Sequence, residues 1–137
     1  MDRYEELENE VSRRLLEYRN EFEAIKKEIA NTDDDIDEWR LLSKKLQNCL
    51  DNLGYAERRL ISLKAKEQEV REMLEGFYDD GYSVHTLVYT PIYKISSYEP
   101  DKYRVRNKYF TTLKEAKEYS ISLGERKNWL EHAYIYL

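Results

Sequence analysis

The side chains able to do chemistry are few and widely spaced. The chain holds one cysteine, Cys49, and two histidines, His85 and His132. A cysteine–histidine nucleophile pair would need these residues to converge from separate elements. Cys49 lies among apolar residues at helical spacing, where a free cysteine usually packs in the core. No zinc-site spacing and no glycine-rich phosphate loop occur in the sequence. We therefore expect a protein that is not an enzyme and has no cofactor.

A cluster of acidic residues raises calcium binding as a second kind of chemistry. The cluster joins two predicted helices and consists of Asp33, Asp34, Asp35, Asp37 and Glu38. It lacks the glycine and the distal glutamate of an EF-hand loop. Negative side chains also stabilise the start of a helix, and Thr32 or Asp33 is suited to cap it. We therefore expect a helix N-terminus here and no metal.

Basic residues alternate with other types along residues 102–108. A single strand would present all of these cations on one face, because side chains of a strand alternate between its faces. Across a predicted hairpin, Lys94 would add a fifth charge and Tyr98 a ring for stacking. The candidate partner-binding residues are Lys94, Tyr98, Lys102, Arg104, Arg106 and Lys108.

Three interpretations of this basic face remain open. It is a solvated face whose charges discourage edge-to-edge pairing, a surface that binds nucleic-acid phosphates or an acidic protein, or a contact with the acidic first helix of the same or a neighbouring chain. The net charge of −5 and the isoelectric point near 5.2 disfavour nucleic acid, since a field of that sign slows association with polyanions.

Charge and tyrosine are unevenly distributed along the 137 residues. Residues 1–76 have a net charge of −6 and residues 77–137 a net charge of +1, and the acidity peaks at −8 within residues 1–38. This acidic segment is either a solvated helix face or an imitation of DNA. Of the 13 tyrosines, 10 lie between Tyr78 and Tyr136. Tyrosine is favoured at interfaces, so we expect the C-terminal part to bind a partner.

Two long helices are predicted for the N-terminal half. Along both predicted helices, apolar residues recur at spacings of three and four residues. From Leu42 onward the spacings of four and three alternate without a break, also past Gly54, and this alternation is typical of a coiled coil. Glu67 is the one charged residue in this series. We expect an antiparallel helical hairpin whose second helix reaches Gly76 as one continuous or mildly bent helix.

A small α/β unit is predicted after Gly76. Residues 83–90, continued by 92–97, and residues 102–110 read as two strands of a hairpin. Thr112 and Glu115 match a capping box, and Gly124 is suited to end the following helix. Residues 133–137 read as a last strand, which a right-handed crossover would place beside the first.

The predicted fold class is therefore α+β: an N-terminal antiparallel, coiled-coil-like helical hairpin over residues 1–76, followed by a small, tyrosine-rich ββαβ unit with a three-stranded sheet over residues 77–137. The single cysteine favours a reducing compartment, and we expect a cytoplasmic location. No stretch is apolar enough to span a membrane, and the N-terminus lacks the apolar region of a signal peptide.

No motif identifies a family, but the acidic, motif-free layout is similar to that of small accessory proteins of phages and mobile elements. That resemblance implies a non-enzymatic interaction protein that binds and inhibits a host defence or nucleic-acid-processing complex. We expect a protein partner and self-association of the helical hairpin as a homo-oligomer. The alternative is a nucleic-acid-binding accessory protein that uses the basic face of residues 102–108.

Overall fold

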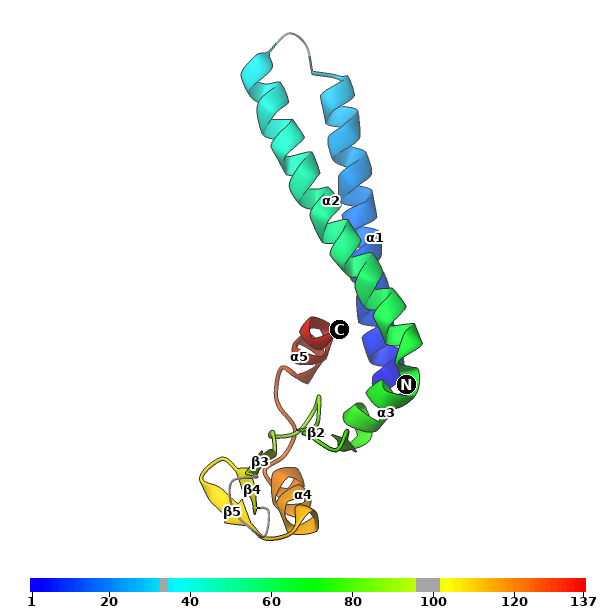
Figure 1. Cartoon of the computed structure of the whole chain (residues 1–137). Helices are drawn as coiled ribbons and strands as arrows, with labels where there is room; N and C mark the ends of the chain where they lie inside the picture. The colour runs from blue at the N-terminus through cyan, green and yellow to red at the C-terminus, as the bar shows by residue number, and fades with distance from the viewer. Residues whose placement is uncertain (33–34, 96–101) are drawn as a thin grey trace. The chain divides into compact units, whose positions relative to one another are not determined.

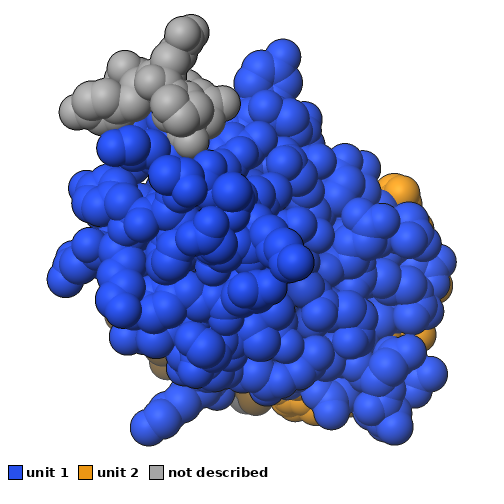
Figure 2. Space-filling view, turned by 90° about the horizontal axis from the view of Figure 1, so that it is seen from below, with its two compact units in different colours: residues 1–7, 66–137 blue, residues 8–65 orange. Residues whose placement is uncertain are grey.

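The computed structural model describes residues 1–32, 35–95 and 102–137. It confirms the predicted mixed α+β class, with two long N-terminal helices packed together and a three-stranded antiparallel sheet (Figure 1). The chain divides into two compact units, the hairpin unit of residues 8–65 and the mixed unit of residues 1–7 and 66–137 (Figure 2). A domain boundary at the change in composition after Gly76 stays a prediction.

Helices α1 (Arg3–Ala30) and α2 (Ile36–Ala65) form the helical hairpin. The fully buried positions of α2 recur every seven residues, at Leu42, Cys49, Ala56 and Leu63. The Cys49 thiol lies 3.3 Å from the backbone carbonyl oxygen of Tyr18, which joins the two helices. Burial raises the pKa of this thiol, so Cys49 is the core residue that its spacing predicts.

The second helix passes through Gly54 without a break but is interrupted at Lys66. Helix α3 (Glu67–Glu75) then begins a separate helical segment, so the expectation of one continuous helix to residue 76 is wrong. The buried side chains of α3 are Val70, Met73 and Leu74. Glu67 is exposed and forms an ion pair of 3.0 Å with Arg71. The charged residue in the apolar series therefore marks the end of the α2 seam.

The start of α2 is capped by Asp35. Its carboxylate accepts the backbone N–H groups of Asp37 and Glu38 at 3.1 and 3.2 Å. The Thr32 hydroxyl instead donates to the carbonyl of Glu28 at the end of α1, and the other predicted cap, Asp33, lies outside the described residues. Of the acidic cluster, Asp35 thus serves a helix N-terminus, at a position further along the chain than the predicted caps.

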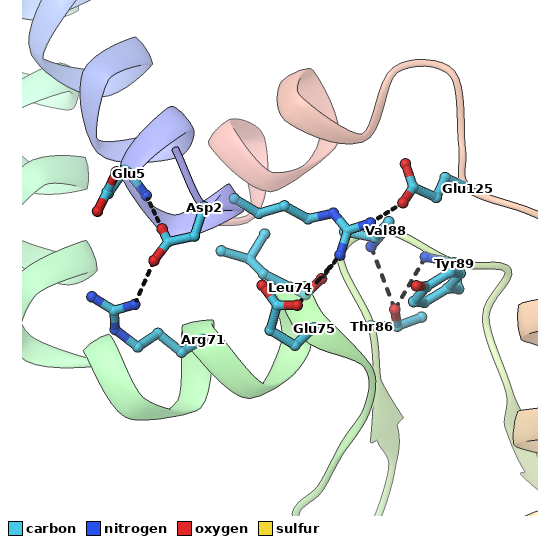
Figure 3. A network of polar contacts seen from close by, with 10 residues as sticks. Asp2, Glu5, Arg71, Leu74, Glu75, Thr86, Val88, Tyr89 and Glu125 are labelled. Atoms are coloured by element: carbon cyan, nitrogen blue, oxygen red, sulfur yellow. Dashed lines mark hydrogen bonds and ion pairs between the residues drawn. The ribbon is translucent and has the colours of Figure 1, made fainter.

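The extended segment predicted at residues 83–90 is a strand only at its start. Strand β2 (Val84–His85) pairs with β1 (Tyr78–Asp79) in a two-stranded sheet. The Thr86 hydroxyl then accepts the N–H groups of Val88 and Tyr89, at 3.4 and 3.1 Å. Figure 3 shows these contacts. Because a side chain takes the donors that a ladder would use, the chain turns instead of continuing the strand.

The three-stranded sheet has the order β3-β4-β5, with β3 at Tyr93–Ile95, β4 at Lys102–Val105 and β5 at Lys108–Phe110. One face packs on α4 (Leu113–Ser122), around a buried cluster of Val84, Ile92, Val105 and Ala116. Thr112 caps α4 by accepting the N–H of Glu115 at 3.3 Å, and Gly124 follows its end with a positive φ of 84°. The cap at Thr112 and the helix end before Gly124 are confirmed. The Glu115 carboxylate accepts the Thr112 hydroxyl at 3.0 Å, and the reciprocal bond of a capping box, from the Thr112 N–H, stays a prediction.

The third strand of the sheet is β5, and the predicted last strand at residues 133–137 is wrong. These residues belong to helix α5 (Trp129–Tyr136). A strand would bury alternate residues, whereas the adjacent Ala133 and Tyr134 are buried and Ile135 is exposed. Trp129 and Leu130, four residues earlier, are partly buried. Burial at i and i+4 is helical, so apolar pairs at 129–130 and 133–134 were the signal for a helix.

Long-range polar contacts hold the mixed unit together near the N-terminus (Figure 3). The Arg3 guanidinium donates to the Leu74 carbonyl at 3.2 Å and forms ion pairs with Glu75 and Glu125. Asp2 accepts the Glu5 N–H at 2.8 Å and pairs with Arg71 at 3.4 Å. The first residues of α1 are therefore bound to α3 and to the segment that follows α4.

Candidate functional site

A turn divides the predicted basic strand. Val105 of β4 pairs with Lys108 of β5, so Arg106 and Asn107 form a two-residue connection between antiparallel strands. Arg106 has a φ of 52°, in the left-handed region, as the first central residue of a primed hairpin turn requires. The prediction of one strand over residues 102–110 is therefore wrong. Asparagine at 107 was a weak turn signal in a segment otherwise rich in strand-forming residues.

The alternation of basic and other residues along residues 102–108 predicts that the four cations share one face. The turn separates them. Lys102 and Arg104 share one face of β4, while Lys108 lies opposite Val105 on the face that packs on α4. The Lys108 ammonium is 4.7 Å from the ring centre of Tyr119 in α4. Arg106 is exposed in the turn. The predicted face of four cations is therefore wrong.

Of the remaining two candidates, Lys94 does not extend the face of Arg104. Lys94 pairs across the sheet with Tyr103 and so lies on the opposite face. Its ammonium is 2.9 Å from the Asp79 carboxylate, and this contact lowers the pKa of Asp79 and raises that of Lys94. Tyr98 lies outside the described residues.

A row of three side chains crosses the face of the sheet that points away from α4. Tyr93 pairs with Arg104, and Arg104 pairs with Tyr109, so one residue comes from each strand. The Arg104 guanidinium carbon lies 4.9 Å from the centre of the Tyr93 ring. Tyr93 and Tyr109 are 51% and 62% exposed. We call these three residues the outer row.

Both histidines line a single cavity of about 370 Å³ in the mixed unit. The His85 Nε2 atom lies 2.9 Å from the Asp80 carboxylate, which together with two backbone N–H groups lowers the pKa of Asp80 to about 2. His132, from α5, is partly buried. The sequence placed the two histidines in separate strands. Their approach depends on the turn at Asp79–Gly81 and on α5, and no spacing in the sequence indicates it.

Neither the outer row nor the lining of the cavity includes Cys49. Cys49 belongs to the hairpin unit and is 2% exposed. Within residues 1–32, 35–95 and 102–137, no three histidine, cysteine or acidic side chains form a group able to hold a metal ion. No helix in this part of the chain is long and apolar enough to cross a membrane.

Comparison with protein families, with characterised proteins and with solved structures finds no match to this chain. The outer row and the cavity are therefore the features of the chain that bear on its function.

Proposed function

We propose that the chain is a non-enzymatic interaction protein that binds a partner protein through the outer row. The observation that supports this is the exposure of Tyr93 and Tyr109 on either side of Arg104, on a sheet whose other face is covered by α4. Tyrosine and arginine are enriched among the residues that dominate binding energy at protein interfaces. The stacking of Arg104 on Tyr93 orders the arginine before binding, which reduces the entropy lost on association.

The proposed partner has an acidic surface. Lys102 lies on the same face of β4 as Arg104, and the exposed Arg106 follows at the end of that strand. Among the described residues, no carboxylate forms an ion pair with Arg104. A guanidinium that stacks on a ring through its flat face leaves its N–H edge available, and this edge can bind a carboxylate of the partner through two parallel hydrogen bonds. Charge of opposite sign on the partner would speed the encounter and fix its orientation.

Photo-crosslinking tests this proposal. A p-benzoylphenylalanine in place of Tyr109 should give a discrete crosslinked product with a protein from the cells that express the chain, and Arg104→Glu in the same chain should reduce its yield at least tenfold. Lys114→Glu is the matched control, because Lys114 is exposed on α4 and carries the same charge change. Equal loss in both variants, or an unchanged yield in Arg104→Glu, would contradict the proposal.

Nucleic acid is the alternative partner, because bases stack on exposed aromatic rings and arginine. Only Lys102 and Arg104 remain together on the outer face, which leaves fewer phosphate contacts than four aligned cations would make. Binding of a labelled single-stranded oligonucleotide that weakens steeply with salt and is abolished by Tyr109→Ala would favour this alternative and contradict the protein-binding proposal.

Self-association of the helical hairpin is a further part of the proposed function. Helix α2 exposes apolar side chains beside its buried seam, including Ile36, Trp39 and Leu50. Trp39 is 53% exposed although it continues the apolar spacing of the seam. Sedimentation equilibrium should show a dimer or larger species that Trp39→Ala shifts toward the monomer. A wild-type chain that stays monomeric at 100 times the protein concentration of the crosslinking experiment would contradict self-association. That the chain inhibits a host complex stays a prediction, which the identity of the crosslinked partner would test.

A further inference from the structure

The cavity that holds both histidines differs in chemistry from the outer row. Its walls come from β2, β3, α5 and the segment between α4 and α5, all within the mixed unit. Four of the lining side chains carry nitrogen groups that are cationic or can become so, and no lining residue is acidic. These four are His85, Lys94, Arg126 and His132. Its volume of about 370 Å³ is within the range of small-molecule sites.

Two of the four groups already have acidic partners outside the lining. Lys94 pairs with Asp79 at 2.9 Å, and His85 pairs with Asp80 at 2.9 Å. Both carboxylates are fixed by the turn between β1 and β2, where Asp79 accepts the Gly81 N–H at 2.9 Å. The positive charge at this side of the cavity is therefore largely compensated.

The opposite situation holds at Arg126. Its Nε donates to the carbonyl of Tyr89 at 3.0 Å, and its backbone N–H donates to the carbonyl of Val88 at 2.8 Å. These bonds fix the guanidinium at the cavity wall. Within the described part of the chain, no carboxylate forms an ion pair with Arg126. The side chain therefore brings an uncompensated charge to the cavity.

The charge of Arg126 affects the protonation of His132. Burial and, secondarily, the nearby Arg126 lower the pKa of His132, so at neutral pH its imidazole is uncharged. A neutral imidazole beside a fixed guanidinium still has an N–H group to donate. An anion placed between the two would accept hydrogen bonds from both and would favour protonation of His132.

We propose that this cavity binds a phosphate monoester whose molecule also contains a flat aromatic ring, with Arg126 and His132 holding the phosphate. A phosphate monoester carries a charge of about −1.5 to −2 at neutral pH and three acceptor oxygens. Arginine binds such oxygens in a bidentate manner, and the third oxygen is left for His132. The aromatic side chains Tyr82 and Tyr136 and the apolar Leu87 and Ile92 also line the cavity. These walls provide contact area for the ring.

Isothermal titration calorimetry with adenosine 5′-monophosphate, O-phosphotyrosine, adenosine and inorganic phosphate tests the proposal. Both esters share the chemistry, and their relative affinity shows whether a nucleotide or a phosphorylated side chain is the source. At least one ester should bind at least tenfold more tightly than adenosine or phosphate alone. Arg126→Gln should weaken that ester at least tenfold, and His132→Asn at least threefold.

Lys127→Gln is the control, because Lys127 is the exposed neighbour of Arg126 and does not line the cavity. It should leave the affinity within twofold of the wild type. Should Arg126→Gln unfold the chain, His132→Asn and the nuclear magnetic resonance titration of the two histidines still decide. The bound ester should raise the pKa of His132. The other charged or titratable groups at the cavity are Arg126, His85 and Lys94 in its lining, and Asp80 and Asp79, which pair with His85 and Lys94. The lining residue Tyr136 also interacts electrostatically with Glu69, Asp80 and Tyr78.

Three outcomes would overturn the proposal. The first is no ester binding at millimolar concentration, and the second is equal loss of affinity in Lys127→Gln and Arg126→Gln. The third is ester binding that leaves the histidine resonances unchanged. The outer-row variant Tyr109→Ala should bind the ester normally, because Tyr109 does not line the cavity, so failure here is separate from failure of the protein-binding proposal.

Discussion

The hairpin unit and the mixed unit use polar side chains differently. In the hairpin unit most ion pairs join residues three or four apart on one helix, as Arg13 does with Glu10 and Glu17 at 2.5 Å. In the mixed unit several polar contacts join residues that are distant in the chain. Ser120 donates to the carbonyl of Thr90 at 2.6 Å, and Lys94 pairs with Asp79 at 2.9 Å.

The two units therefore differ in how much a single polar side chain contributes to stability. Exposed pairs within one helix contribute little, about 0.3–0.5 kcal/mol each, so the hairpin depends on the repeated apolar seam of α2. The mixed unit has short strands of two to four residues, and it depends on individual buried contacts that fix loops. Both the outer row and the histidine cavity lie in this unit, where tertiary contacts can bring unlike groups together.

The largest expected effect tests the seam. Leu63 is fully buried, so Leu63→Ala should lower the free energy of unfolding by about 3 kcal/mol through lost burial and a cavity. Leu41→Ala on the same helix is the control, because Leu41 is exposed and surface changes usually stay within about 0.5 kcal/mol. Urea unfolding followed by circular dichroism measures both. Similar losses would show that the seam does not dominate the hairpin's stability.

The next effect tests a single long-range contact in the mixed unit. Ser120 is fully buried, and Ser120→Ala would leave the Thr90 carbonyl without this donor. We expect a loss of about 1–2 kcal/mol, since an unsatisfied buried acceptor keeps its desolvation cost. Ser122→Ala, which removes an exposed hydroxyl that donates within α4, should change the unfolding midpoint much less. A midpoint shift in Ser122→Ala as large as that in Ser120→Ala would remove the distinction.

Helix caps should contribute equally in both units. Asp35→Ala at α2 and Thr112→Ala at α4 each remove a side-chain acceptor for backbone N–H groups, so each should cost about 1 kcal/mol. Asn should substitute for either residue with little loss, because it also caps helices. Because both caps act within one helical turn, the two alanine variants should agree within about 0.5 kcal/mol in urea unfolding.

The smallest effect concerns the turn beside the cavity and depends on pH. Asp80 has a folded-state pKa of about 2, against 3.8 for the isolated group. Because the folded-state pKa is lower, its stabilisation is complete above about pH 4 and is lost as the pH falls toward 2. Asp80→Asn should therefore flatten the acid decline of the unfolding free energy between pH 4 and pH 2. An unchanged slope would mean that His85 and the backbone donors do not stabilise this carboxylate.

The predictions that succeeded depend on neighbours in sequence. The seven-residue recurrence of buried positions in α2 follows from helix geometry alone, which is why Cys49 is found in the core. The cap at Thr112 and the glycine at 124 likewise act within one turn of α4. The predictions that failed took strand-forming residue types as evidence of a strand. Residues 102–110 and 133–137 are both rich in strand-forming types, yet one turns at Arg106 and the other is helical.

Residue patterns along the chain were enough to predict the two helices of the hairpin, the mixed fold class and both ends of α4, because periodicity and capping are local properties. The tertiary structure decided which cations share a face, how the last segment folds and that two histidines line one cavity. The physical reason is that a two-residue turn resets the side-chain alternation of a strand, and that long-range burial outweighs local strand propensity. Both proposed sites are therefore products of tertiary contacts.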